Sequence, residues 1–299
     1  MPLRPHQFDA TKAMFKHSKG QIIIPTGGGK TMCMIDDAEQ RFRSTIADTI
    51  VVVAPRILLA EQLSSEFLEQ IDNVSVMHVH SGETPHYSST NIWDIYSWHK
   101  KTEGNKIIFT TYHSLEKVKT STIDVDTIYF DEAHNSVQRN FFPAVKFFAT
   151  YRANRCFFFT ATPKHSTTPF KAGMNDTKVY GQVIANVPAP KLVDQGYILP
   201  PKVEVYKSRL LRKDEIYSEV ESEQMLSAID RLDVDKVLIC AKSTKQIINL
   251  TSQSDFCYEL NVRGYSWMYI TAKTGAIIDG KKVGRDKFFE VLNAWGKDD

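Results

Sequence analysis

The fold of this chain is decided by residues 21–31, which run Gln21-Ile22-Ile23-Ile24-Pro25-Thr26-Gly27-Gly28-Gly29-Lys30-Thr31. The first four residues form a short apolar run that meets a turn, which predicts a buried strand. From Thr31 onward a helical spacing follows, because apolar residues recur at Met32, Ile35, Ala38 and Phe42. The three glycines therefore lie between a strand and the N-terminus of a helix.

A glycine-rich turn at a helix N-terminus suits an anion, because backbone N–H groups can surround it without Cβ clashes and the helix dipole is positive there. We expect Thr26 to Thr31 to bind phosphates, with Lys30 reaching the β- and γ-phosphates and the Thr31 hydroxyl binding Mg²⁺. Ile24 stands where the usual pattern has its first glycine. Taken alone, the stretch also allows a turn with no ligand.

Composition sets the outer limits. The chain has 299 residues, 37 basic and 35 acidic side chains and a formal net charge of +2, so any basic track must be local. That length allows one large domain or two smaller ones. The four cysteines are scattered, which predicts reduced thiols in the core: Cys33, Cys156, Cys240 and Cys257. Without a long apolar run or a leader, we expect a cytoplasmic protein with no membrane partner, in the host cytoplasm if viral.

Further strands alternate with helices, which predicts an α/β fold with a parallel sheet whose ligands lie outside the carboxyl ends of the strands. The predicted strands are residues 49–54, 74–80, 107–111, 127–130 and 155–159. The fourth of them ends in Asp131 and Glu132, two carboxylates that are costly to bury unless a cation uses them. We expect Asp131 to hold the Mg²⁺ and Glu132 to orient or deprotonate the attacking water. A solvated acidic turn is the alternative.

Two histidines lie on the predicted strand 74–80. His78 and His80 would point the same way, which would allow metal binding. The strand itself contains no carboxylate or cysteine to join them. We therefore do not predict a metal site there.

The pattern changes after residue 179. Tyr180-Gly181, four prolines and Gly196 predict a linker between two domains. We place a first domain at 1–185, the linker at 186–201 and a second domain at 202–299. Expected elements of the second are a strand at 202–206, a helix at 213–231, a strand starting at Lys236-Val237-Leu238-Ile239-Cys240, and a last helix at 285–295.

The motifs together resemble those of superfamily 2 nucleic-acid helicases or translocases of the DEAH type, nearest to restriction-enzyme motor subunits and phage DNA helicases. Residues 25–31 resemble motif I, Asp131-Glu132-Ala133-His134 motif II, and Thr160-Ala161-Thr162 motif III. The resemblance implies a P-loop NTPase with a complete first RecA-like lobe and an incomplete second one. It implies ATP with Mg²⁺, catalysis by Lys30, Asp131 and Glu132, and coupling of nucleotide to nucleic acid through His134, Thr160 and Thr162.

Three weaker motif matches imply further residues that contact the nucleotide base or the nucleic acid. Gln7 with Arg4 resembles the adenine-reading motif upstream of the loop, since a glutamine amide offers both a donor and an acceptor. Residues 54–62 and 110–115 resemble the two motifs that touch a sugar-phosphate backbone, which assigns Arg56 and Thr111 to nucleic acid.

The resemblance also implies motifs V and VI, which we do not find, so we expect a truncated or split motor with low turnover by itself. A second polypeptide could complete it. The predicted function is ATP-driven movement on, or unwinding of, nucleic acid, DNA in preference to RNA. The alternatives are a nucleotide-dependent binding module without turnover and, more distantly, a P-loop small-molecule kinase. Polarity and pathway stay open.

Overall fold

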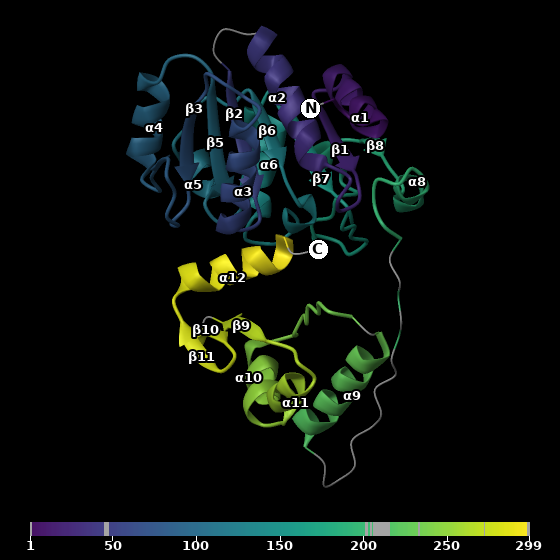
Figure 1. Ribbon diagram of the computed structural model, residues 1–299. Helices are drawn as coiled ribbons and strands as arrows, with labels where there is room; N and C mark the ends of the chain where they lie inside the picture. Colours follow the sequence, from purple (N-terminus) through teal and green to yellow (C-terminus); the bar gives the residue numbers. More distant parts are fainter. Residues whose placement is uncertain are drawn as a thin grey trace. The chain divides into compact units, whose positions relative to one another are not determined.

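The computed structural model describes residues 2–44, 48–200, 203, 205, 216–232, 234–271 and 273–297. The chain divides into two compact units, Met1–Pro201 and Lys202–Asp299, each described by itself below (Figure 1). Residues 186–201, which composition predicts as a linker, are part of the first unit. The reason is packing: Leu192 within this segment is fully buried in the core of that unit.

The first unit is built on an eight-stranded sheet in which neighbouring strands are parallel, in the order β4-β3-β5-β2-β6-β7-β1-β8. The strands are β1 (Lys19–Ile23), β2 (Thr49–Ala54), β3 (Ser75–Val79), β4 (Tyr87–Ser88), β5 (Lys106–Thr111), β6 (Thr127–Phe130), β7 (Arg155–Thr160) and β8 (Val183–Asn186). The α/β class with a parallel sheet is therefore confirmed, and the predicted strands lie within a residue or two of their places.

Helices cover both faces of this sheet (Figure 1). They are α1 (Pro5–Lys16), α2 (Lys30–Ser44), α3 (Ile57–Leu68), α4 (Ile92–Lys101), α5 (Leu115–Thr120), η1 (Ala133–Asn135), α6 (Phe142–Phe147), η2 (Phe148–Arg152), α7 (Thr177–Tyr180) and α8 (Ala189–Asp194). Strand β2 shows how the core is divided, because side chains alternate along a strand. Ile50, Val52 and Ala54 pack with α1, α2 and α3. Val51 and Val53 pack with α4, α5 and α6 on the other face.

A buried ion pair ties helix α2 to strand β7. Arg155 donates from Nη1 and Nη2 to the two Asp37 oxygens at 2.8 and 2.7 Å, and the Tyr129 hydroxyl donates to Asp37 at 2.6 Å. Burial beside the Asp37 carboxylate raises the pKa of Tyr129 well above its ordinary value, so the phenol stays protonated and keeps donating. The pair anchors the helix whose first turn carries Lys30.

Replacing Asp37 by asparagine is expected to destabilise the first unit by about 3 to 5 kcal/mol, because it leaves the Arg155 guanidinium buried without its charge partner. The matched control is Glu39→Gln on the same helix, which removes the exposed Arg43 pair and should change stability by less than about 1 kcal/mol. Urea unfolding followed by intrinsic fluorescence measures both. Equal effects of the two substitutions would contradict the role given to the buried pair.

The second unit differs from the sequence prediction. Its described elements are α9 (Tyr217–Leu232), α10 (Thr244–Ser252), α11 (Phe256–Val262), β9 (Met268–Thr271), β10 (Gly275–Ile278), β11 (Lys281–Val283) and α12 (Arg285–Lys297). The last helix agrees with the prediction. The strand predicted at 202–206 and the start of the helix predicted at 213–231 lie outside the described residues.

The strand predicted at Lys236–Cys240 is wrong. Those residues have no regular secondary structure and pair with no strand among the described residues, and Leu238 is 77% exposed. A parallel strand needs neighbours and helices on both faces to bury an apolar run. In the described part of this unit the strands instead form an antiparallel sheet in the order β11-β10-β9.

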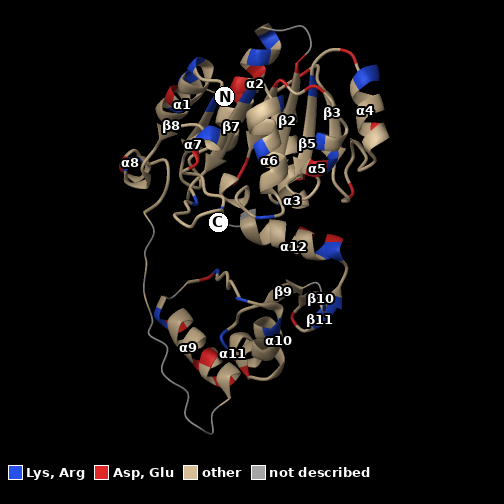
Figure 2. Ribbon diagram, turned by 180° about the vertical axis from the view of Figure 1, so that it is seen from behind, with Lys and Arg blue, Asp and Glu red and all other residues tan. Residues whose placement is uncertain are grey.

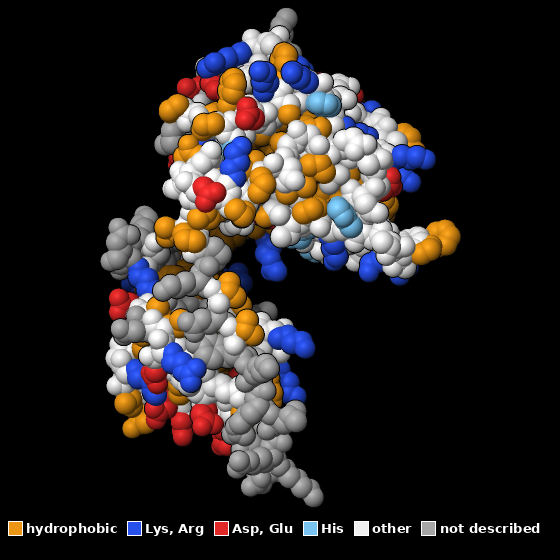
Figure 3. All heavy atoms as spheres, turned by 90° about the vertical axis from the view of Figure 1, so that its right-hand side faces the viewer, with side chains coloured by type: hydrophobic (Ala, Val, Ile, Leu, Met, Phe, Trp, Pro, Cys, Tyr) orange, Lys and Arg blue, Asp and Glu red, His pale blue; other side chains and the backbone are white. Residues whose placement is uncertain are grey.

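Charges of both signs and apolar side chains are mixed on the surface. Figure 2 shows Lys and Arg interspersed with Asp and Glu, as the near-neutral net charge implies. Figure 3 shows hydrophobic side chains among polar ones on one face of the first unit. All four cysteines are free, but only Cys33 and Cys156 are buried, so the expectation of core thiols fails for the exposed Cys240. Among the described helices, none has the length and apolar character that a membrane span needs.

Candidate functional site

Strand order brings the predicted site together. Strands β6, β7 and β1 are consecutive in the sheet, and each is followed at its carboxyl end by one of the predicted motifs. The glycine loop follows β1, Asp131 and Glu132 follow β6, and Thr160 ends β7. Motifs about 100 residues apart in the sequence thus meet at one edge, as expected for a parallel α/β sheet.

The loop conformation requires its glycines. Gly27 and Gly29 have φ angles of +77° and +82°, which side-chain-bearing residues rarely adopt. At Gly28 an added Cβ would lie 2.5 Å from the Ile24 side chain. The result is a turn of bare backbone at the start of α2, with Thr26 and Gly27 exposed and Thr31 half-buried in the first helical turn. Such a turn is suited to an anion.

Helix α1 braces this loop from behind. The Gln7 amide nitrogen donates to the carbonyls of Gly28 and Gly29 at 3.3 and 3.4 Å, and its oxygen accepts from the Arg4 backbone N–H at 2.8 Å. His6 Nε2 lies 2.8 Å from the Gly28 carbonyl oxygen. Gln7, predicted to read adenine, is thus buried and occupied within the chain here, and its contact with a base stays a prediction.

The acidic pair behind the loop carries an electrostatic cost. Burial, with the Glu132 charge adjacent, raises the pKa of Asp131 to about 6, against the opposing effect of Lys30. Lys30 Nζ lies 3.5 Å from Glu132 Oε1. Glu132 itself has a φ of 43°, in the left-handed region where non-glycine residues store strain. Two carboxylates at a buried edge with one lysine fit a site that a divalent cation would complete, with oxygen donors that Mg²⁺ prefers.

A chain of contacts links this acidic pair to the end of β7. His134 Nδ1 lies 3.4 Å from Glu132 Oε2 and 3.1 Å from Thr160 Oγ1. The backbone N–H of Thr162 donates to the same Thr160 oxygen at 3.1 Å. The three residues assigned to coupling therefore lie together, and they connect Glu132 with the exposed turn at Thr162.

The two predicted nucleic-acid residues lie in different environments. Arg56 is exposed at the N-terminal cap of α3. Thr111 is 4% exposed, and its hydroxyl accepts from the Ser114 N–H at 3.3 Å, which shapes the turn after β5. The next residue was not predicted: the buried Tyr112 hydroxyl donates to the Asp131 carbonyl at 2.9 Å. That bond joins the turn after β5 to the acidic pair.

Two residues near the glycine loop were missed. His6 lies directly before Gln7 in the sequence, and its contact with the loop could have been suspected from that. Tyr197 has no such signal, because it comes far downstream, yet the Arg4 guanidinium lies 4.8 Å from the centre of its ring. Arg4 also faces the Gly27 carbonyl at 3.4 Å. Arg4 and Tyr197 thus flank the rim of the loop.

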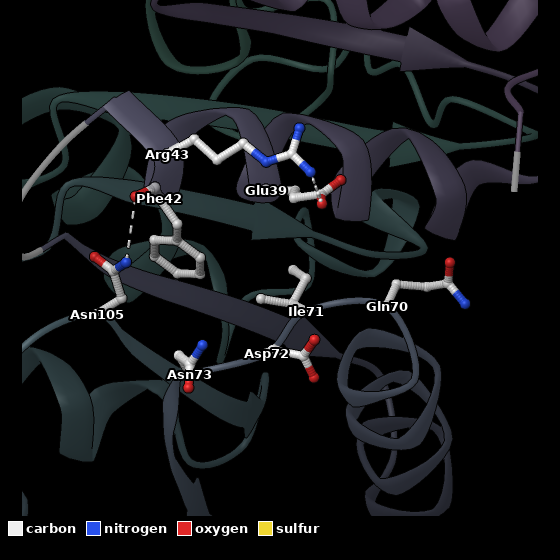
Figure 4. A pocket seen from close by; sticks show the side chains of 8 residues that line it. All are labelled: Glu39, Phe42, Arg43, Gln70, Ile71, Asp72, Asn73 and Asn105. Carbon is white, nitrogen blue, oxygen red and sulfur yellow. Dashed lines mark hydrogen bonds and ion pairs between the residues drawn. The ribbon is translucent and has the colours of Figure 1, made fainter.

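The pocket drawn in Figure 4 is elsewhere. It has a volume of about 320 Å³ and lies near the amino ends of β3 and β5, where Asn73 and Asn105 line it. The predicted motifs follow the carboxyl ends of their strands. The hollow is therefore at the opposite edge of the sheet and is no part of the site.

Comparison with known proteins gives a family for most of the first unit. A model of the family described as "Type III restriction enzyme, res subunit" matches residues 1–165. No curated protein sequence matches the chain.

Two solved structures share the fold. One is a nuclease-deletion mutant of the Type ISP restriction-modification enzyme LlaGI in complex with a DNA substrate mimic, with a TM-score of 0.55 and 20% identity over 79% of this chain and 23% of that one. The other is the ATP-dependent Type ISP restriction-modification enzyme LlaBIII bound to DNA, with a TM-score of 0.55 and 20% identity over 66% of this chain and 16% of that one. This chain thus spans less than a quarter of either protein.

The family match covers more than half of the residues of this chain and contains the glycine loop, the acidic pair and Thr160. The chain therefore belongs to the family of Type III restriction enzyme res subunits.

Proposed function

We propose that this chain is the nucleotide-binding part of an ATP-driven motor that moves on or unwinds nucleic acid, as a superfamily 2 protein of the DEAH type. The observation that carries the proposal is the continuous set of contacts from Lys30 through Glu132 and His134 to Thr160, because it joins the phosphate loop to two neighbouring strand ends. DNA is the preferred substrate, since both similar structures are of DNA complexes. Kinship with phage helicases, a cytoplasmic location and a completing second polypeptide are finer proposals of the same kind.

The residues divide the work as follows. The backbone N–H groups of Gly27 to Thr31 and the Lys30 ammonium hold the triphosphate. Thr31 and Asp131 are the proposed ligands of Mg²⁺, which when bound neutralises phosphate charge. Glu132 orients the attacking water and accepts its proton, while its contact with Lys30 sets the carboxylate position. His134 and Thr160 pass the state of Glu132 to the turn at Thr162.

Arg56 and the turn that Thr111 shapes are proposed to face the sugar-phosphate backbone. Arg56 is exposed and carries the charge. Thr111 is buried, so its contribution is to fix the turn, and Tyr112 connects that turn with Asp131. Binding of a nucleic-acid strand and binding of nucleotide are thereby linked through the contact between Tyr112 and Asp131.

Replacing Arg56 by alanine should weaken binding of single-stranded DNA and make it less dependent on salt. Each phosphate that a cation neutralises contributes about 0.7 to the slope of log K against log salt for single strands, so the slope should fall by roughly that amount. Fluorescence anisotropy with a labelled oligonucleotide at several salt concentrations measures it. Lys12→Ala on α1 is the matched control, since that cation is exposed and α1 packs against β1 and β8, whereas α3 packs against β2 and β5.

Three results would count against the proposal. If the unaltered chain binds ATP but binds no nucleic acid at any salt concentration, the result would favour the alternative of a P-loop small-molecule kinase. If Arg56→Ala and Lys12→Ala lower the slope equally, the basic track lies elsewhere. Binding that responds to nucleotide without any hydrolysis would favour the alternative of a nucleotide-dependent binding module.

A further inference from the structure

A second cluster of ligand-type side chains lies outside the nucleotide site, between helix α3 and strand β3. Glu61 Oε1 lies 3.1 Å from His78 Nδ1 and 3.0 Å from His80 Nε2, and the two histidine nitrogens are 3.0 Å apart. The three atoms thus form a nearly equilateral triangle. His78 and His80 are 0% and 3% exposed, respectively.

Hydrogen bonds alone leave this triangle incomplete. A single proton between His78 Nδ1 and His80 Nε2 can form a hydrogen bond between the two rings. The buried Oε1 of Glu61, however, has no aligned hydrogen-bond donor among the residues that the structure describes. An unpartnered buried carboxylate oxygen is costly. A cation placed against the triangle would contact all three atoms at once and remove that cost.

The dimensions fit a transition metal. Zn²⁺ binds histidine nitrogen and carboxylate oxygen at about 2.0 to 2.2 Å, and tetrahedral ligands at that distance lie roughly 3.3 to 3.6 Å from one another. The observed separations are slightly shorter, so small side-chain movements would suffice. Two histidines and one carboxylate are also a known ligand set for catalytic zinc, with the fourth position open to water.

The surroundings support the first histidine as a ligand. His78 Nε2 faces the Ser64 hydroxyl at 3.0 Å, so Nε2 can carry the proton and leave the Nδ1 lone pair for a metal. Glu61 is 23% exposed, which gives an ion a path from solvent.

His80 must change its hydrogen bond to act as a ligand. Its Nδ1 accepts from the Gly82 backbone N–H at 3.2 Å. A neutral ring that binds a metal through Nε2 carries its proton on Nδ1, so the Gly82 N–H would lose this acceptor. Metal binding at this place should therefore change the hydrogen bonding of the Gly82 amide.

We propose that Glu61, His78 and His80 form a Zn²⁺ site that fastens helix α3 to strand β3, distinct from the Mg²⁺ site at Asp131. The sequence did not reveal it because Glu61 lies on another element, well before the two histidines. The site would fix the helix that begins beside Arg56.

The test uses the full chain, stripped with EDTA and titrated with Zn²⁺ against a chromogenic chelator. One tightly bound Zn²⁺ per chain is expected. Glu61→Gln and His80→Gln should each weaken it more than about 100-fold, and Ser64→Ala, which removes the outer partner of His78, by about 10- to 100-fold. Glu66→Gln on the same helix and Asp131→Asn at the nucleotide site are the matched controls and should keep the affinity.

A second measurement covers the case in which the variants fold poorly. In the unaltered chain, Zn²⁺ should shift the Gly82 amide resonance, and Co²⁺ in its place should show the intense visible absorption of a site with fewer than six ligands. Zinc binding that survives all three substitutions, or a Gly82 resonance that does not respond to saturating Zn²⁺, would overturn the proposal and leave a hydrogen-bonded cluster only.

Discussion

Lys30→Ala is expected to weaken ATP binding by at least about 100-fold, which corresponds to about 2.7 kcal/mol. The Lys30 ammonium lies beside the acidic pair, with its Nζ 3.5 Å from Glu132 Oε1, and the lysine is at the end of the glycine loop. Backbone N–H groups supply partial charges, whereas the triphosphate brings several full negative charges beside Asp131 and Glu132. Without the ammonium, only Mg²⁺ and the backbone N–H groups would offset the repulsion among these anions.

Isothermal calorimetry with ATP and Mg²⁺ measures this effect. The substitution also removes the charge that opposes the raised pKa of Asp131, so the folded state must be checked by circular dichroism. Lys30→Gln, which keeps length and polarity, should lose affinity to a similar extent. The exposed Lys12→Ala variant should bind as the unaltered chain does. Unchanged affinity in both Lys30 variants would remove the nucleotide site from this loop.

Glu132→Gln is expected to preserve ATP binding within a few-fold and to slow hydrolysis by about 10²- to 10⁴-fold, the usual contribution of a general base. The amide keeps the shape and the contact distance to Lys30 but cannot accept a proton from water. His134 would lose the charged partner that lies 3.4 Å away. Single-turnover hydrolysis with protein in excess over ATP measures the rate of the chemical step in both proteins.

The same experiment separates Glu132 from Asp131. Asp131→Asn removes a proposed Mg²⁺ ligand, so it should weaken binding of ATP with Mg²⁺ while leaving ATP without Mg²⁺ nearly unaffected. If Glu132→Gln instead abolished ATP binding, Glu132 would act as a metal ligand or as a structural residue, given its strained backbone at φ 43°. Equal hydrolysis by the variant and the unaltered chain would exclude it as the base.

The local elements of the first unit could be predicted from the sequence. Residues 21–31 contain within a few positions both the apolar run that forms β1 and the glycines that permit φ angles of +77° and +82°. The ends of β5, β6 and β7, at or next to Thr111, Asp131 and Thr160, followed from periodicity to within a residue. The parallel arrangement followed because helices alternate with strands, and a parallel sheet gathers its functional turns at one edge.

Other predictions failed where burial depends on distant partners. Lys236–Cys240 has the composition of a buried strand, but a strand forms only where a neighbour accepts its hydrogen bonds, and no described residue does. Residues 186–200 have the prolines of a linker, yet Leu192 packs into the core of the first unit. Composition shows which secondary structures a segment can form, whereas contacts with residues distant in the sequence decide which of them it forms.

The glycine loop, the acidic pair and the α/β class could therefore be predicted from the sequence, because each depends on residues that are close together in the chain. Only the tertiary structure brought Gln7 and His6 behind the loop, Tyr112 onto Asp131, and Glu61 to the two buried histidines. The physical reason is strand order. Side chains from α3 and β3, or from β5 and β6, come into contact only when the order of the strands in the sheet is established. That order depends on packing interactions throughout the first unit.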